Sequence, residues 1–160
     1  MKIINLFALT VMISCMLVSA CGHKYIDKEI KADLVSKAKE DVNFAGLMFT
    51  VFNGNVAIWG KCASERSKQL VKTKIKTIHM INHINEQIIV GNVKLDADYN
   101  QKLKIDGVLV NYPGVAASVS RQVISLIGYV EPDRYHELLK DMRRFSSDID
   151  SRKLQSNLRR

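Results

Sequence analysis

The stretch that decides the fold runs from Phe49 to Cys62 and reads FTVFNGNVAIWGKC. Apolar residues alternate with polar ones on both sides of Asn53-Gly54, a pattern typical of two strands. Asn-Gly is a strong hairpin signal because both residues tolerate positive φ. Ser64, which follows the second strand, is a residue type that caps helices well. The stretch therefore predicts a β-hairpin that leads directly into a helix.

The second half of the chain repeats this pattern. Placing Gly60 on Gly128 aligns apolar residues along both strands and into the following helix. The matched pairs are Val51 with Val119, Val56 with Ile124, Ile58 with Leu126, Cys62 with Val130, and Leu70 with Leu138. Arg121-Gln122 stands where the first copy has Asn-Gly, so the second turn is less well specified. An internal repeat of this length indicates two copies of one small unit.

Each copy is predicted to contain a helix, two strands, a second helix and a third strand. We expect two helices on one face of a three-stranded mixed sheet, which places the protein in the α+β class. Asp27 and Asp98 are predicted N-caps of the two leading helices, and Lys31 is predicted on the solvent face. The predicted helices cover residues 27–41, 64–78, 98–111 and 131–145, and the predicted third strands cover 84–90 and 149–154.

The N-terminal residues are typical of a bacterial lipoprotein. Lys2 precedes a short apolar stretch, as in a secretory signal, and Val18-Ser19-Ala20-Cys21 resembles a lipobox. We expect residues 1–20 to be removed and Cys21 to carry the lipid, palmitate included. An uncleaved anchor is the alternative, although the stretch is short against the ~20 apolar residues of a membrane span. Gly22 after the cysteine implies, by resemblance to enterobacterial sorting, the periplasmic face of the outer membrane.

The expected organisation follows from these boundaries. Its segments are a signal peptide at 1–20, a linker at 21–26, domains at 27–91 and 96–155, and a basic tail at 156–160. The connector between the two domains is too short to keep them apart, so we expect them to touch.

The motif Gly54-x-Val56-x-Ile58-x-Gly60-x-Cys62, with a helix before it and a helix and strand after it, resembles the BON domain of bacterial envelope proteins. Two copies behind a lipoprotein signal are similar to outer-membrane lipoproteins with two BON domains. The resemblance is closer for the first copy, because the second lacks the turn glycine. It implies phospholipid binding, a part in envelope integrity and no catalytic activity.

The chain is basic, with 24 Lys and Arg against 16 Asp and Glu, a net charge of +8 and a pI of about 9.5. A basic protein favours anionic partners. Secretion removes nucleic acid from reach, so an anionic phospholipid membrane is the expected partner, with up to about 1 kcal/mol per basic residue near the surface. Ordinary solvated helix faces remain the alternative interpretation of these charges.

The resemblance places the first helix of the second domain near the lipid. The candidate membrane contacts are Val108 and Leu109 on that helix and Tyr112 directly after it, together with Arg143 and Arg144. The rival hypothesis is an adaptor that docks on an envelope assembly or secretion machine. It would use the sheet edge, or the exposed sheet face on which Trp59 is predicted as a partner contact. Packing of the two domains over that face is the alternative interpretation of Trp59.

No motif indicates an enzyme, a cofactor or a metal. His79 and His83 fall where a helix should end, and no residue at ligand spacing completes a site. Ser36-x-x-Lys39 matches a fragment of the serine–lysine motif of penicillin-binding enzymes, without its partner motifs. Cys62 is left alone once Cys15 leaves with the signal and Cys21 is acylated, so it is predicted to be a small buried apolar side chain.

Overall fold

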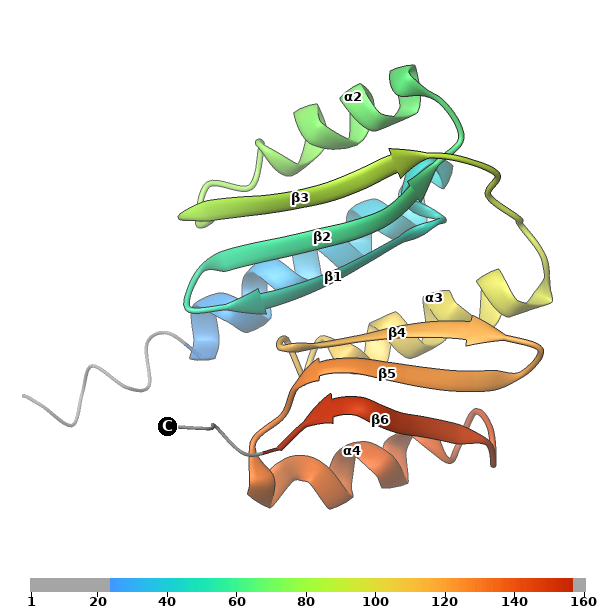
Figure 1. Ribbon diagram of the computed structural model, residues 1–160. Helices are drawn as coiled ribbons and strands as arrows, with labels where there is room; N and C mark the ends of the chain where they lie inside the picture. The colour runs from blue at the N-terminus through green and yellow to red at the C-terminus, as the bar shows by residue number, and fades with distance from the viewer. Residues whose placement is uncertain (1–23, 157–160) are drawn as a thin grey trace, which may run out of the picture.

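The computed structural model describes residues 24–156. The protein is α+β, with two three-stranded mixed sheets and helices packed against them (Figure 1). The predicted signal peptide, the lipid attachment site and most of the basic tail lie outside the described residues.

The first sheet belongs to the first half of the chain. Its strands lie in the order β1-β2-β3, with β1 antiparallel and β3 parallel to β2. The elements are a helix over residues 24–40, the 3-10 turn η1 (Val42–Phe44), β1 (Leu47–Phe52), β2 (Asn55–Cys62), α2 (Glu65–Ile75) and β3 (His83–Val90). Ser64 caps α2 as predicted, because its hydroxyl accepts a hydrogen bond from the backbone N–H of Ser67 at 3.1 Å.

The second half repeats this order. The elements are α3 (Ala97–Leu109), β4 (Val115–Ser120), β5 (Val123–Tyr129), the 3-10 turn η2 (Pro132–Arg134), α4 (Tyr135–Met142) and β6 (Ile149–Gln155). The weakly apolar closing strand does form. It pairs in parallel with β5, with a register shift between Ser125 and Ile127.

Two pairs of glycines show that the halves share one backbone design. Gly60 has φ of 129° and Gly128 has φ of 119°. A Cβ atom on Gly60 would lie 2.2 Å from the carbonyl oxygen of Gly46, and a Cβ atom on Gly128 would lie 2.2 Å from that of Gly114. Both positions therefore require glycine, for its positive φ and for the close approach of two strands.

Asp27 and Asp98 support the two hairpin turns instead of capping helices, which corrects the prediction. The Asp27 carboxylate accepts hydrogen bonds from the backbone N–H groups of Asn53 and Gly54, at 2.8 and 2.6 Å. The Asp98 carboxylate accepts hydrogen bonds from the backbone N–H groups of Arg121 and Gln122 in the second turn. Both of these residues have positive φ. The helix at 24–40 already covers Asp27, and α3 is capped by Asp96.

Each half has its own apolar core. The first contains Leu34, Phe49, Ile58 and the buried Cys62, and the second is built around Ile105, Leu126 and Leu138. In the second helix of each half, the buried residues correspond with a shift of one residue from the predicted alignment, so that Val71 and not Leu70 matches Leu138. Val71 and Ile75 are the buried residues of α2, Leu138 and Met142 those of α4, and Leu70 is 43% exposed.

The two units lie against each other along β1 and β4, which run side by side through the middle of Figure 1. The backbone N–H of Val51 donates to the carbonyl oxygen of Pro113 at 2.8 Å. Val110, from the second half, packs against the core of the first. The short connector therefore joins two units in contact, and their shared seam is where a site can be built from both.

Candidate functional site

An interdomain groove of about 690 Å³ lies at one end of this seam. Ligand pockets commonly have volumes of roughly 300–1,000 Å³, so the groove is large enough for a small ligand or a lipid headgroup. Its walls come from the helix at 24–40, the β1–β2 turn, the segment after α3 and the end of β5. The aromatic and basic side chains that line it include Lys28, Tyr25, Phe52, Tyr112, Tyr129 and Arg134.

Four aromatic side chains line these walls, Tyr25, Phe52, Tyr112 and Tyr129. The Phe52 and Tyr129 rings meet edge to face with centroids 6.4 Å apart, which joins the two domains at the groove. A second hollow of about 370 Å³ shares Phe52, Gly114 and Tyr129 with the groove. Tyr25 is 65% exposed and Phe52 is 51% exposed. Large exposed rings on a concave surface are typical of a binding site more than of a packed core.

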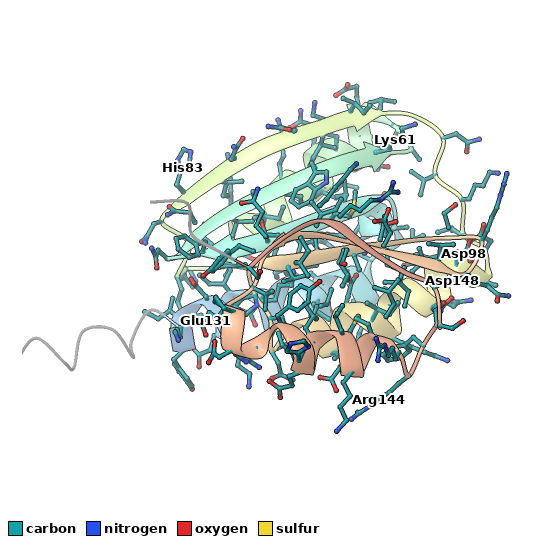
Figure 2. All side chains as sticks on the ribbon, turned by 60° about the horizontal axis from the view of Figure 1, so that its bottom comes forward. Lys61, His83, Asp98, Glu131, Arg144 and Asp148 are labelled. Atoms are coloured by element: carbon teal, nitrogen blue, oxygen red, sulfur yellow. The ribbon has the colours of Figure 1, made fainter. Side chains whose placement is uncertain are left out.

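The groove carries basic groups at its rim. The Lys24 ammonium lies 2.6 Å from the Glu131 carboxylate and so links the first helix to the end of β5. Figure 2 shows Glu131 beside that helix. Lys28 is exposed, and no ion pair within residues 24–156 neutralises it. Its ammonium is therefore placed to meet an anionic ligand.

Arg134 is held in place by three contacts. Its Nη1 donates to the carbonyl oxygen of Asn111 at 2.8 Å, its Nε lies 3.3 Å from Glu137, and its guanidinium sits 4.5 Å from the centre of the Tyr112 ring. Burial, and then the hydrogen bond from the Tyr112 hydroxyl to Asp141, raise the pKa of Tyr112 to about 12. The tyrosine is neutral at ordinary pH, and the contacts with Asn111 and Glu137 hold the guanidinium over its ring at the groove wall.

A buried polar cluster lies deeper in the seam, outside the groove. Lys31 is 1% exposed, and its Nζ donates to the carbonyl oxygens of Phe49 at 2.5 Å and Val115 at 2.9 Å. The prediction that Lys31 lies on the solvent face is therefore wrong. Lys102 forms a buried ion pair with Asp106 on α3. Burial, as the largest cause, lowers the pKa of Lys31 to about 7.

The predicted membrane contacts fall in three different surroundings. Tyr112 lines the groove although it is only 3% exposed. Leu109 is fully buried in the second core, and Val108 is partly buried against that core. Arg143 and Arg144 are exposed beyond α4 and do not line the groove; Figure 2 shows Arg144 projecting away from the molecule. Leu109 cannot reach a membrane in this conformation.

Trp59 lies outside the groove as well. It is half-buried on the open face of the first sheet, in one row with Met48 and Gln87. Within residues 24–156 no three His, Cys, Asp or Glu side chains lie close enough together to hold a metal ion. In the same residues, every helix is too short or too polar to cross a bilayer.

Sequence reasoning missed the groove residues Tyr25, Phe52, Tyr129 and Arg134. A usable signal was present for two of them. Phe52 and Tyr129 lie at strand ends, outside the alternating core positions of their strands. A large ring at such a position has no core to enter and marks a contact surface. Nothing in the sequence indicated that the ends of β1 and β5 would meet.

Comparisons with known proteins add little to this geometry. No known family profile matches the chain, and no curated protein matches it. The fold is similar to the C-terminal domain of CdsD, a structural protein of the type III secretion system of Chlamydia trachomatis, with 12% identity and a TM-score of 0.33 over 74% of this chain. That match spans only 61% of the CdsD chain. A second CdsD structure gives 10% identity and a TM-score of 0.34, over 76% of this chain and 90% of that one. These values are too low to support a functional inference.

Proposed function

We propose that this protein is a non-catalytic, lipid-anchored BON-type protein of the outer membrane. It binds anionic phospholipid in the interdomain groove and so contributes to envelope integrity. The observation that carries the proposal is the combination of exposed aromatic rings with basic groups at the rim, from Tyr25, Phe52, Lys28 and Arg134. Aromatic side chains favour the headgroup level of a bilayer, and basic side chains favour anionic headgroups.

The position of the predicted anchor supports the same function. Cys21 precedes Lys24 by three residues, and Lys24 lines the groove. Three residues of extended chain span no more than about 11 Å. An acylated Cys21 would hold the rim of the groove close to the headgroups, so that lipid meets the groove without any extension of the protein.

Vesicle flotation of the unacylated protein, starting at residue 22, tests the proposal. The protein should float with vesicles that contain phosphatidylglycerol and stay in solution with pure phosphatidylcholine vesicles. Lys28→Glu should weaken flotation roughly tenfold, since it replaces an attraction of about 1 kcal/mol near the surface by a repulsion. Tyr25→Ala should weaken it through the loss of the most exposed ring.

Lys104→Glu is the matched control, because Lys104 is exposed on α3 and lies outside the groove. It makes the same change of net charge as Lys28→Glu. Equal losses in the two variants would mean that net charge alone drives binding, and the groove would then have no part in it. Flotation that does not depend on anionic lipid would contradict the phospholipid function itself.

A further inference from the structure

The two sheets have the same fold, but the outer edge of the first sheet is regular and open while that of the second is irregular and charged. Within residues 24–156, β3 pairs only with β2 and β6 only with β5. Each therefore has a row of backbone N–H and C=O groups on its free side. Figure 2 shows β3 at the border of the molecule, from His83 onward.

The β6 edge is protected. It carries Asp150, Arg152 and Lys153, and its pairing with β5 is interrupted by a register shift. The Asp150 carboxylate also accepts a hydrogen bond from the backbone N–H of Arg152 at 3.1 Å and two from its guanidinium. These bonds hold the pKa of Asp150 well below its usual range. Charges, bulges and occupied N–H groups are the means by which natural edges resist strand addition.

The β3 edge has none of these protections. Its eight residues pair with β2 in one unbroken register, and they include no Lys, Arg, Pro or Gly. The single charge, Glu86, is neutralised by Lys72 at 2.9 Å and Lys68 at 3.9 Å. Ile89 is 58% exposed and Val90 is 45% exposed. A long, regular edge with exposed apolar side chains is a template for another strand.

The charge around β3 selects the kind of strand that fits. The neighbouring helix α2 is strongly basic, with Glu65 as its one acidic residue. Its basic side chains, with its C-cap, are Arg66, Lys68, Lys72, Lys74 and Lys76. Lys68 and Lys72 pair with Glu86 and Lys74 pairs with Asp41, so within residues 24–156 Arg66 and Lys76 are the ones without an ion pair. Pairing of β3 with β3 of a second copy would bring two such helices together, which like-charge repulsion opposes. The chain's own C-terminal residues include Arg159 and Arg160 and are equally unsuited.

From these observations we infer that β3 is a docking edge for an extended acidic segment of another protein, which joins the first sheet as a fourth strand. Backbone hydrogen bonds along β3 hold the segment. Its apolar side chains cover Ile89 on the open face, and its carboxylates lie on the opposite face, toward the basic side chains of α2. On the open face the added strand extends the row of Met48, Trp59 and Gln87. This surface is separate from the lipid groove and operates without it.

The test uses synthetic peptides with the unacylated protein. The probe is an eight-residue, fluorescein-labelled peptide of alternating glutamate and valine, the length of β3. Fluorescence anisotropy should show saturable binding with a Kd below about 1 mM. The same peptide with alternate backbone amides N-methylated should not bind, because it lacks the main-chain donors of one edge. A peptide of alternating lysine and valine should not bind either.

Two variants locate the contact. Ile89→Asp should weaken binding of the acidic peptide roughly tenfold, through lost apolar contact and a new repulsion. Leu95→Asp is the matched control, because Leu95 is equally exposed, at 58%, and lies outside β3. It should bind the peptide like the wild type. The wild-type dissociation constant of the acidic peptide is the quantity against which both are measured.

Three results would overturn the inference. The first is no binding of the acidic peptide at about 1 mM. The second is equal binding of the N-methylated or the basic peptide, which would show attraction without strand addition. The third is a wild-type dimer in solution that Ile89→Asp dissociates, which would mean that a second copy occupies the edge.

Discussion

The Nζ atom of Lys31 lies 2.9 Å from the carbonyl oxygen of Val115, so a side chain of the first domain bonds to the backbone of the second. The same atom lies 4.6 Å from the centre of the Phe49 ring. Lys102 of the second domain approaches that ring from 5.9 Å. Around Phe49 the seam therefore brings together Lys31, Lys102 and Asp106, and these contacts join the two domains.

This arrangement predicts a pH dependence of stability. The pKa of Lys31 is lowered from 10.5 to about 7 in the folded protein, while the unfolded chain keeps the ordinary value. Between these pH values the unfolded state binds more protons, so this lysine makes the free energy of unfolding increase as pH rises from 7. Below pH 7 its full penalty is present. Urea denaturation between pH 6 and 9 should show this increase.

Lys31→Met removes the titrating group and should flatten the increase. Lys104→Met, on the exposed side of α3, is the control and should keep the wild-type slope. The comparison is made between variants because burial also raises the pKa of Cys62, whose titration acts in the opposite direction. A slope unchanged by Lys31→Met would assign the pH dependence to other groups.

The glycine pairs predict a sharp contrast between two alanine substitutions. Gly60→Ala should destabilise the protein by about 3 kcal/mol, since its Cβ would collide with the Gly46 carbonyl at a positive φ. Gly107→Ala should stabilise it by up to about 1 kcal/mol, because Gly107 is inside α3 and its Cβ would meet only the Lys39 Nζ, at 3.5 Å. Thermal unfolding of both variants measures the difference, and similar effects would contradict the close approach of the strands at Gly60.

The second hairpin turn holds two non-glycine residues at positive φ, Arg121 at 50° and Gln122 at 67°. A left-handed conformation costs a non-glycine residue about 1 kcal/mol or more. Gln122→Gly should therefore raise the free energy of unfolding by about 1 kcal/mol. The converse change, Gly54→Gln, should lower it, because a Cβ there would also lie 2.4 Å from the Asn82 amide. No gain from Gln122→Gly would mean that Asp98 already compensates the strain.

The lipid anchor has its own test. Cys21→Ser should abolish incorporation of a radiolabelled fatty acid and leave the protein unprocessed or soluble, because the hydroxyl cannot replace the thiol that accepts diacylglycerol. Cys62→Ser is the control, since that thiol is buried, and it should keep the label. Continued labelling of the Cys21 variant would remove the lipoprotein interpretation, the outer-membrane location and the argument that places the groove near headgroups.

Much of the fold was predictable from local patterns. The Asn53-Gly54 turn, the Ser64 cap and the alternation into Gly60 are signals that act over a few residues, and the structure contains each of them. Asp27 shows the limit. Its side chain type suits an N-cap, but its partners are backbone groups at residues 53 and 54. A contact between residues far apart in the sequence produces no local pattern from which it could be predicted.

The groove was less predictable for the same reason. Tyr25 and Tyr129 belong to different domains and line one groove only because β1 lies against β4. Lys31 was assigned to the solvent face from its charge, since lysine is rarely buried without partners. Here two carbonyl oxygens and an aromatic ring provide those partners. Helical spacing alone could not distinguish an interdomain face from a solvent face.

Cys62 tests the register of β2 and the core together. It is fully buried, on the same face as Val56 and Ile58, and its Sγ lies 3.5 Å from the Asn43 carbonyl oxygen. Burial raises the pKa of the thiol, and thiols react as thiolates. A chain starting at residue 22 should therefore react slowly with a thiol reagent when folded and quickly in denaturant.

Two substitutions at this position separate volume from charge. Cys62→Val, the residue that the second copy has at Val130, should cost less than about 1.5 kcal/mol, because a buried thiol packs like a small apolar group. Cys62→Asp should cost several kcal/mol, about 3 or more, since it buries a carboxylate without a partner. Both costs are measured by urea denaturation. Fast labelling of the folded protein, or a Cys62→Asp variant as stable as Cys62→Val, would place the thiol at the surface and shift the register of β2.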